Sequence, residues 1–243
     1  MRWLEVEDAY EVARVGAATR VIFSAEHASN RLPDGWRWPE ADLALADSHW
    51  AWDPGVRELC LELTERLRTT AVLARFSRLL ADPNRPEGHP ELFRKEADGA
   101  PVALNQALSD EEIERRLERC YRPYHARLDG EVARHPAPLC FSIHSFTPVY
   151  QGTPRTLELG VLFNEEVALA ESLAAHLGQA GYDVRLNEPY SGKAGLIYSI
   201  EQPARRHGRR ALELEARSDL LTDGAFRSRL LERLAEWLLA LRL

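Results

Sequence analysis

The sequence predicts a three-layer α/β fold with a mixed, largely parallel sheet. Strand-like and helical patterns alternate along the chain, which is typical of βαβ units that place helices on both faces of a sheet. The 243 residues suffice for one sizeable hydrophobic core. The sequence shows no internal repeat, low-complexity tract or linker. We therefore expect a single domain over residues 1–243.

The first elements follow one another closely. Thr19–Ser24 is rich in apolar and β-branched residues and predicts a buried strand, and Glu40–Asp47 predicts a short helix. Apolar residues at helical spacing predict a helix over Pro54–Thr69, with Asp53 as its N-cap. The apolar segment Ala71–Phe76 then predicts a second strand.

A long loop precedes the next helix and strand. Ser77–Pro90 is rich in arginine and proline and predicts an irregular loop. Ser109 and Glu112 form a capping box that opens a helix, which Pro123 should kink or interrupt. Pro138–Ile143 is a second apolar run and predicts a strand.

The last third of the chain repeats the alternation. Thr156–Phe163 predicts a strand. A helix should follow to about Ala180, with Asn164 as its N-cap. Asp183–Leu186 predicts a short strand, and Ala211–Ala216 predicts a strand of alternating apolar and acidic residues. An amphipathic helix is expected over Thr222–Leu243.

Composition narrows the function. The net charge is −7 and the pI about 5.7, which argues against nucleic acid or an anionic membrane as the main partner. We expect the basic run Arg205–Arg210 to be a solvated loop. The three cysteines, Cys60, Cys120 and Cys140, form no CxxC pair, and we expect a cytoplasmic protein without disulfides. No segment has the pattern of a signal peptide or a transmembrane helix.

Two of the apolar runs end at a histidine. His27 and His144 follow their strands and are each followed by small polar residues, and the ends of parallel strands are where ligands bind. A single histidine of this kind is more often an ordinary hydrogen-bonded residue. The recurrence favours metal ligation, and catalytic zinc needs about three protein ligands and an open position for water. We therefore predict that both histidines bind one Zn²⁺ or a similar divalent ion.

The third metal ligand stays open among four residues. Asp53 is our first choice, although an N-cap before a proline would equally explain it. Asp47, His49 and Asn30 are the alternatives.

The loop after the second strand offers groups for an anionic substrate. Asn84 and Arg85 lie in Asp82–Pro86, and an amide beside a guanidinium suits a carboxylate. A solvent-exposed turn is the alternative. Arg78 could polarise a carbonyl or join a surface ion pair.

A general base is expected on the strand near the C-terminus. Alternation places Glu213 and Glu215 on one face, where a carboxylate could take a proton from water and pass it to the leaving nitrogen. The alternative is a solvated face paired with Arg217. The GxSxG, GxGxxG, P-loop and HExxH motifs are absent from the sequence, and nothing marks Ser145 as a nucleophile.

Six motifs together resemble the N-formylglutamate amidohydrolase family, in particular its short, divergent branch. The family is similar to the zinc carboxypeptidases and aspartoacylases, which present in order a His, an Asn-Arg pair, a second His and a Glu. The motifs span almost the whole chain: EHASN at 26–30, HWAWDPG at 49–55, SRLLADPNRP at 77–86, HSFTP at 144–148, NEPYSG at 187–192 and ELEARSDL at 213–220.

The resemblance implies a phosphorylase/hydrolase-like fold and a zinc-dependent amidohydrolase that cleaves the amide of an N-acyl amino acid such as N-formylglutamate. It implies His27 and His144 as metal ligands, Asn84 and Arg85 as the residues that bind the substrate carboxylate, and Glu215 as a catalytic residue. Beside these residues we expect Asp53 as a further metal ligand, Arg78 as a second catalytic residue, and Arg217 and Ser145 as further substrate-binding residues, with Arg78 or Arg217 assisting at the oxyanion.

Two alternatives have different functions. One is a small-peptide carboxypeptidase, or a deacylase for another N-acyl amino acid, on the same scaffold. The other is a metal-free binding protein, because carboxypeptidase relatives carry a ligand Glu three residues after the first His, where this chain has Asn30.

Overall fold

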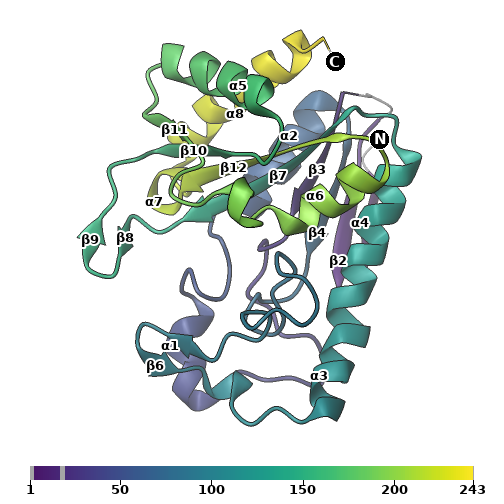
Figure 1. The fold of residues 1–243 in the computed structure, drawn as a ribbon, viewed down its shortest axis with the longest axis vertical. Coiled ribbons are helices and arrows are strands. Elements are labelled where there is room, and N and C mark those ends of the chain that lie inside the picture. The colour runs from purple at the N-terminus through teal and green to yellow at the C-terminus, as the bar shows by residue number, and fades with distance from the viewer. Residues whose placement is uncertain (1–2, 17–19, 243) are drawn as a thin grey trace.

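A computed structural model describes residues 3–16 and 20–242. Its central sheet has eight strands in the order β1-β2-β4-β3-β7-β12-β10-β11, which confirms the predicted mixed α/β fold (Figure 1). The strands are β1 Trp3–Val6, β2 Tyr10–Arg14, β3 Val21–Ala25, β4 Thr70–Ala74, β7 Leu139–Phe146, β10 Leu159–Leu162, β11 Val184–Leu186 and β12 Arg210–Arg217.

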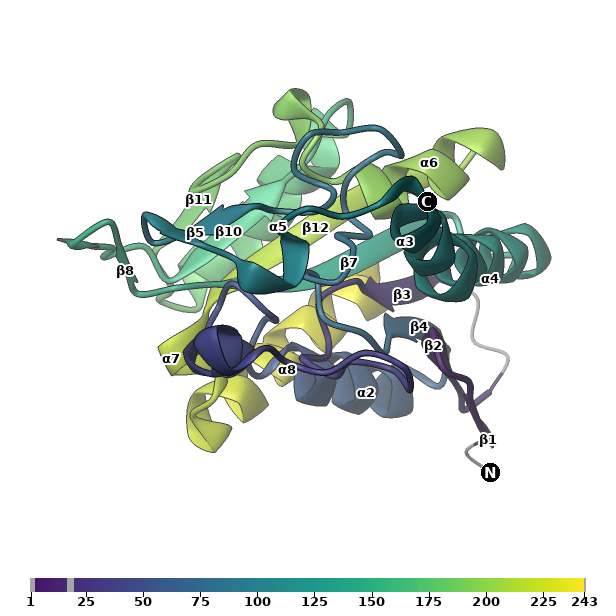
Figure 2. The same ribbon diagram turned by 90° about the horizontal axis from the view of Figure 1, so that it is seen from below.

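Helices cover both faces of the sheet. The α-helices are α1 Leu43–Ala46, α2 Val56–Leu67, α3 Asp110–Arg116, α4 Arg122–Arg134, α5 Val167–Gln179, α6 Tyr198–Arg206, α7 Ser218–Leu221 and α8 Gly224–Ala240. One hydrophobic cluster joins α2, α5 and α8 to the sheet, and a second joins α4 and α6 to the opposite face. Figure 2 shows α2 and α8 below the sheet and α6 above it. Burial of apolar surface on both faces is the main stabilisation of this three-layer arrangement.

Shorter elements complete the chain. Two small hairpins pair β5 Glu96–Ala97 with β6 Ala100–Pro101, and β8 Val149–Tyr150 with β9 Thr153–Pro154. The 3₁₀ turns are Glu40–Asp42, Ala103–Asn105 and Gly192–Ala194, and a π turn covers Leu117–Tyr121. None of the helices in residues 3–16 and 20–242 is long and apolar enough to cross a bilayer.

Parallel pairing in the middle of the sheet positions the site. β4, β3, β7 and β12 are parallel neighbours, so their carboxyl ends meet at one edge. The register places Ser24 beside Ser142, and His144 beside Glu215. The segments 26–55 and 75–109, which follow β3 and β4, gather on one side of the sheet (Figure 1).

Several local predictions need correction. The prediction missed β1 and β2, which pair in antiparallel fashion at one sheet edge. The N-cap of α2 is Gly55 at φ +83°, not Asp53, because the Asp53 carboxylate bonds instead to Ser145 N–H. The N-cap of α5 is Glu166, since the Asn164 amide donates to Glu201. The run Arg205–Arg210 begins inside α6 and ends in β12 rather than forming only a loop.

The other predicted helix boundaries are close to the observed ones. Ser109 accepts from Glu112 N–H and caps α3, as the sequence predicted. The π turn immediately precedes Pro123, so the interruption expected there takes this form. The predicted strand Thr19–Ser24 is observed as β3 from Val21, and Thr19 lies outside the described residues.

The loop 187–192 packs tightly on β10 through two glycines. Asn187 Oδ1 accepts from Phe163 N–H at 3.1 Å and from Gly192 N–H at 3.0 Å. A Cβ added at Gly160 would lie 2.0 Å from the Glu188 carbonyl oxygen, and one at Gly192 would lie 2.5 Å from the Phe163 carbonyl. Glycine at these positions therefore lets the loop, which carries Tyr190, reach the sheet edge.

Gly160→Ala should consequently lower the free energy of unfolding by about 2–3 kcal/mol, because the new methyl group collides with backbone. Urea unfolding measures the effect. Gly178→Ala in α5 is the matched control, since a Cβ added there would meet no atom within 4 Å, and it should be neutral or stabilising. Equal behaviour of the two variants would contradict the tight packing.

Candidate active site

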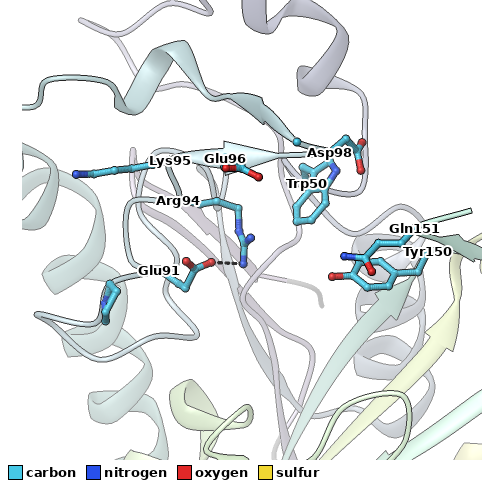
Figure 3. A pocket seen from close by; sticks show the side chains of 10 residues that line it. Trp50, Glu91, Arg94, Lys95, Glu96, Asp98, Tyr150 and Gln151 are labelled. Carbon is cyan, nitrogen blue, oxygen red and sulfur yellow. Dashed lines mark ion pairs between the residues drawn. The ribbon is translucent and has the colours of Figure 1, made fainter.

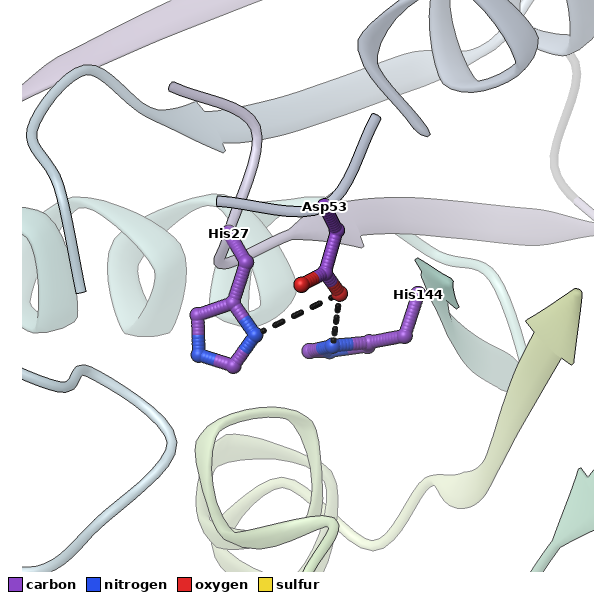
Figure 4. Close-up of side chains that lie close together, drawn as sticks. All are labelled: His27, Asp53 and His144. Atoms are coloured by element: carbon purple, nitrogen blue, oxygen red, sulfur yellow. Dashed lines mark hydrogen bonds and ion pairs between the residues drawn. The ribbon is translucent and has the colours of Figure 1, made fainter. Parts of the chain in front are cut away.

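Three buried side chains meet at the carboxyl ends of β3 and β7. The Nδ1 atoms of His27 and His144 lie 3.5 Å and 3.1 Å from Asp53 Oδ2, and the two ring centroids are 4.7 Å apart. Figure 4 shows both rings turning Nδ1 towards the same carboxylate. One ligand atom from each residue lies within 4.8 Å of the others, so the three fit the coordination of a single ion.

His27 Nδ1 supplies a test of this fit. The atom is buried and has no hydrogen-bond partner among the residues that the structure describes. Buried polar atoms in proteins nearly always have a hydrogen-bond partner. Metal ligation would explain why this ring nitrogen has none. Two imidazole nitrogens and a carboxylate oxygen form a donor set that zinc accepts. The residues therefore fit a divalent metal.

The far nitrogen of each ring contacts another carboxylate. His27 Nε2 lies 2.8 Å from Asp82 Oδ1, and His144 Nε2 lies 2.9 Å from Glu26 Oε2. Burial would raise the pKa of Glu26, but bonds from His144 and two serines lower it to about 2. Burial opposes the charge of His144, yet the surrounding carboxylates raise its pKa well above the ordinary value.

Two glutamates of β12 face the same cluster, as their alternation predicted. Glu213 Oε2 lies 3.4 Å from His144 Nε2. Burial raises the pKa of Glu213 well above its ordinary value and that of Glu215 to about 8. Oε2 of each is buried and accepts no hydrogen bond from the described part of the chain. A buried carboxylate with a free oxygen beside a reaction site is suited to moving a proton.

Arg78 bridges two of the carboxylates. Its guanidinium lies 3.0 Å from Asp82 Oδ2 and 3.5 Å from Asp53 Oδ1. Burial disfavours the charge, but Asp82 and Asp53 raise the pKa of Arg78 above its ordinary value. The backbone holds it in place, because Arg78 N–H donates to Ala51 C=O. Arg78 thus places a fixed positive charge beside the metal-ligand cluster.

The Asn84-Arg85 pair lies on the cavity wall, but the two side chains are in different situations. Asn84 donates to the Leu196 carbonyl at 2.7 Å and accepts from Ser199 N–H at 3.0 Å, so its amide fastens the loop to the start of α6. Arg85 donates to the Asn84 carbonyl, and its Nε has no partner among the described residues. Arg85 therefore keeps donors available for an anion.

The remaining residues that the sequence predicted for the site differ in whether they line the cavity. Ser145 lines the cavity, with its hydroxyl on the Pro54 carbonyl. Asn30 donates to Ala46 C=O and Asp47 and so turns to that segment. His49 lines the cavity, and burial lowers its pKa. Arg217 bonds to Asp219 at 2.8 Å and to the Arg155 carbonyl, a placement that gives no support to its predicted substrate-binding role.

These groups surround a cavity that opens into a larger cleft. The inner cavity has a volume of about 120 Å³ and is lined by the three candidate metal ligands together with Arg78, Arg85, Tyr190, Glu213 and Glu215. The outer cleft measures about 820 Å³ and shares Trp50, Arg94 and Tyr150 with it. In Figure 3, Trp50 and Tyr150 face each other across the cleft, and Arg94 pairs with Glu91.

Sequence reasoning assigned no role to several of these residues. Glu26 and Asp82 contact the histidines, and Tyr150 and Tyr190 line the cavities. Glu26, Asp82 and Tyr190 lie within the motifs EHASN, SRLLADPNRP and NEPYSG, and membership of these motifs is the signal that could have identified them.

Comparisons with known proteins agree with the geometry. A family model described as N-formylglutamate amidohydrolase matches residues 19–222. The chain is 30% identical to an N-formylglutamate deformylase of Pseudomonas putida over 196 residues, which is 71% of each protein. A crystal structure of an Agrobacterium tumefaciens gene product superposes with a TM-score of 0.89 at 30% identity, covering 96% of this chain and 94% of that one. An N-formylglutamate amidohydrolase from Ralstonia eutropha has the same fold, with a TM-score of 0.70 at 24% identity and 96% coverage of both chains.

Proposed function

Because this chain belongs to the N-formylglutamate amidohydrolase family and is therefore an amidohydrolase, we propose that it hydrolyses the N-acyl amide of an amino acid such as N-formylglutamate with one zinc ion. The observation that carries the proposal is the convergence of two Nδ1 atoms on the Asp53 carboxylate. His27, His144 and Asp53 would hold the ion. We also propose a reducing cytoplasm as the setting, since Cys60, Cys120 and Cys140 are free buried thiols.

The surrounding residues divide the remaining work. When bound, the ion would polarise the scissile carbonyl and lower the pKa of a water molecule. Glu215 takes a proton from the attacking water and delivers it to the nitrogen as the C–N bond breaks, which yields a carboxylic acid and a free amine. Arg78 stabilises negative charge on the carbonyl oxygen. Arg85 holds the substrate carboxylate through charge-assisted hydrogen bonds, and Asn84 keeps Arg85 in place.

The outer cleft favours a second candidate, a deacylase or small-peptide carboxypeptidase for larger acyl groups. The inner cavity has room for little more than a small acyl amino acid, and the cleft continues directly from it between Trp50 and Tyr150. Family membership favours either enzyme over a non-catalytic binding protein. A panel of N-formyl, N-acetyl and aminoacyl derivatives of one amino acid separates the two activities, because only the second is faster with the longer acyl groups.

A metal and turnover measurement tests the proposal. Wild-type protein purified without added metal should contain about one zinc per chain, hydrolyse N-formyl amino acids and lose activity to a chelator. His27→Ala should lose most of the metal and reduce turnover by at least about 10³-fold, because it removes one of three ligands. Metal-free wild-type protein with chelator-resistant turnover would refute the zinc site.

A further inference from the structure

Glu26 is a fully buried carboxylate at the exit of β3, with 0% exposure. Ser24 donates to its Oε1 at 2.7 Å, and Ser142 donates to its Oε2 at 2.6 Å. The same Oε2 lies 2.9 Å from His144 Nε2. Burying a carboxylate costs free energy unless hydrogen bonds offset the lost hydration. The three contacts therefore stabilise the Glu26 carboxylate in this position.

The register between β3 and β7 brings these residues together. Ser24 and Ser142 are direct partners on β3 and β7. Ser142 and His144 share one face of β7 because alternate residues of a strand point to the same side. Glu26 lies one residue beyond β3, and its bonds to Ser24 and Ser142 hold its carboxylate on that face. The hydrogen bond between Glu26 and His144 thus joins residues 118 positions apart.

We propose that Glu26 is a positioning residue for His144: it accepts a hydrogen bond from Nε2–H and thereby fixes the ring with Nδ1 directed at the metal position. The inference rests on the proposed metal site. An imidazole that ligates a metal is neutral and carries its proton on the other nitrogen, and the bond made by that other nitrogen decides which nitrogen can ligate. Carboxylate partners of this kind also increase the basicity of the ligating nitrogen, and their loss weakens metal binding about 10–100-fold.

Glu213 is the competing partner, and the contacts favour Glu26. Glu213 Oε2 lies 3.4 Å from His144 Nε2 and has no hydrogen-bond donor within the described chain. Glu26 is closer, and two serine hydroxyls fix its direction. His27 shows the parallel arrangement, with Nε2 on Asp82 and Nδ1 turned inward. In both rings, therefore, Nε2 contacts a different carboxylate and Nδ1 faces the proposed metal position.

The zinc dissociation constant of the purified protein, measured by competition with a chromogenic chelator, tests the proposal. Glu26→Met removes the acceptor, and we expect zinc binding about 100-fold weaker; Glu26→Gln keeps an acceptor oxygen, and we expect about 10-fold. Cobalt substitution adds a second readout, because a reoriented His144 would change the visible spectrum of bound Co²⁺. Glu213→Gln is the comparison variant: it removes a carboxylate that lies 3.4 Å from the same ring nitrogen but that no hydrogen bond directs, and it should weaken zinc binding less than Glu26→Gln does.

The possible results separate the two hypotheses. If wild-type protein binds no zinc, the metal site itself is refuted. If wild type binds zinc and both Glu26 variants bind it equally well with an unchanged cobalt spectrum, the site stands and the positioning role is refuted. Equal weakening in Glu26→Gln and Glu213→Gln would assign the effect to lost negative charge and would also overturn the role. If Glu26→Met does not fold, the zinc dissociation constants of Glu26→Gln and Glu213→Gln still test the positioning role.

Discussion

Glu215→Gln is expected to lower kcat by about 10³-fold while the protein keeps its zinc. The substitution preserves the size of the side chain but removes its ability to accept a proton from water. Glu215 Oε2 is buried and has no donor among the described residues, so this oxygen is available to accept a proton. Initial rates with an N-formyl amino acid, together with zinc content, measure both effects.

The stability of the metal-free variant provides the folding control. Burial raises the pKa of Glu215 from 4.5 to about 8. Between these values the unfolded chain ionises while the folded protein keeps the proton, so this carboxyl group makes the free energy of unfolding fall as pH rises. Below pH 4.5 both states are protonated and nothing is lost. Metal-free Glu215→Gln should therefore match wild type at acidic pH and exceed its stability at pH 8.

Two results would remove Glu215 from this role. Wild-type turnover in the Gln variant would show that another group moves the proton. Loss of zinc together with activity would instead identify Glu215 as a metal ligand, which its place beside His144 and Glu213 permits.

The sequence predicted those parts of the site that depend on local pattern. An apolar run ending in a histidine places that histidine at a strand end, which was sufficient for His27 and His144. Alternation within one strand was sufficient for the shared face of Glu213 and Glu215. Both rules operate over a few residues, and the parallel sheet then brings the strand ends together.

The partners of these residues could not be predicted, because they come from distant parts of the chain. His27 meets Asp82 across 55 positions, and His144 meets Glu26 across 118. Asp53 shows how tertiary contacts override a local preference. Its position before Pro54 suggested an N-cap, whereas in the fold its carboxylate accepts from Ser145 N–H and Gly55 is the N-cap of α2.

The difference between local patterns and long-range contacts also explains why the prediction for the Asn84-Arg85 pair fits Arg85 better than Asn84. The motif indicated a carboxylate clamp made of both side chains. Asn84, however, uses one amide hydrogen and its oxygen to bind the segment Leu196–Ser199, a contact that no short-range pattern encodes. One hydrogen remains for a ligand, and the main anion-binding group left in the pair is Arg85.

Arg85→Met is therefore expected to raise KM for an N-formyl amino acid by about 10–100-fold with little change in kcat. A hydrogen bond to a charged group contributes about 1.5–3 kcal/mol, and a clamp that acts equally in the ground and transition states changes KM alone. Methionine keeps much of the volume and apolar stem of arginine without its donors. Steady-state kinetics at saturating zinc measure both parameters.

Arg94→Met is the matched control, because Arg94 also lines the inner cavity but already pairs with Glu91 and lies 5.0 Å from the Trp50 ring centroid. Its guanidinium is partly neutralised, so its loss should affect KM less than the loss of Arg85. A larger effect at Arg94 would move the carboxylate site to the mouth of the cavity. An unchanged KM in Arg85→Met would refute the clamp, since the donors that Arg85 keeps available in the cavity wall would then contribute nothing to substrate binding.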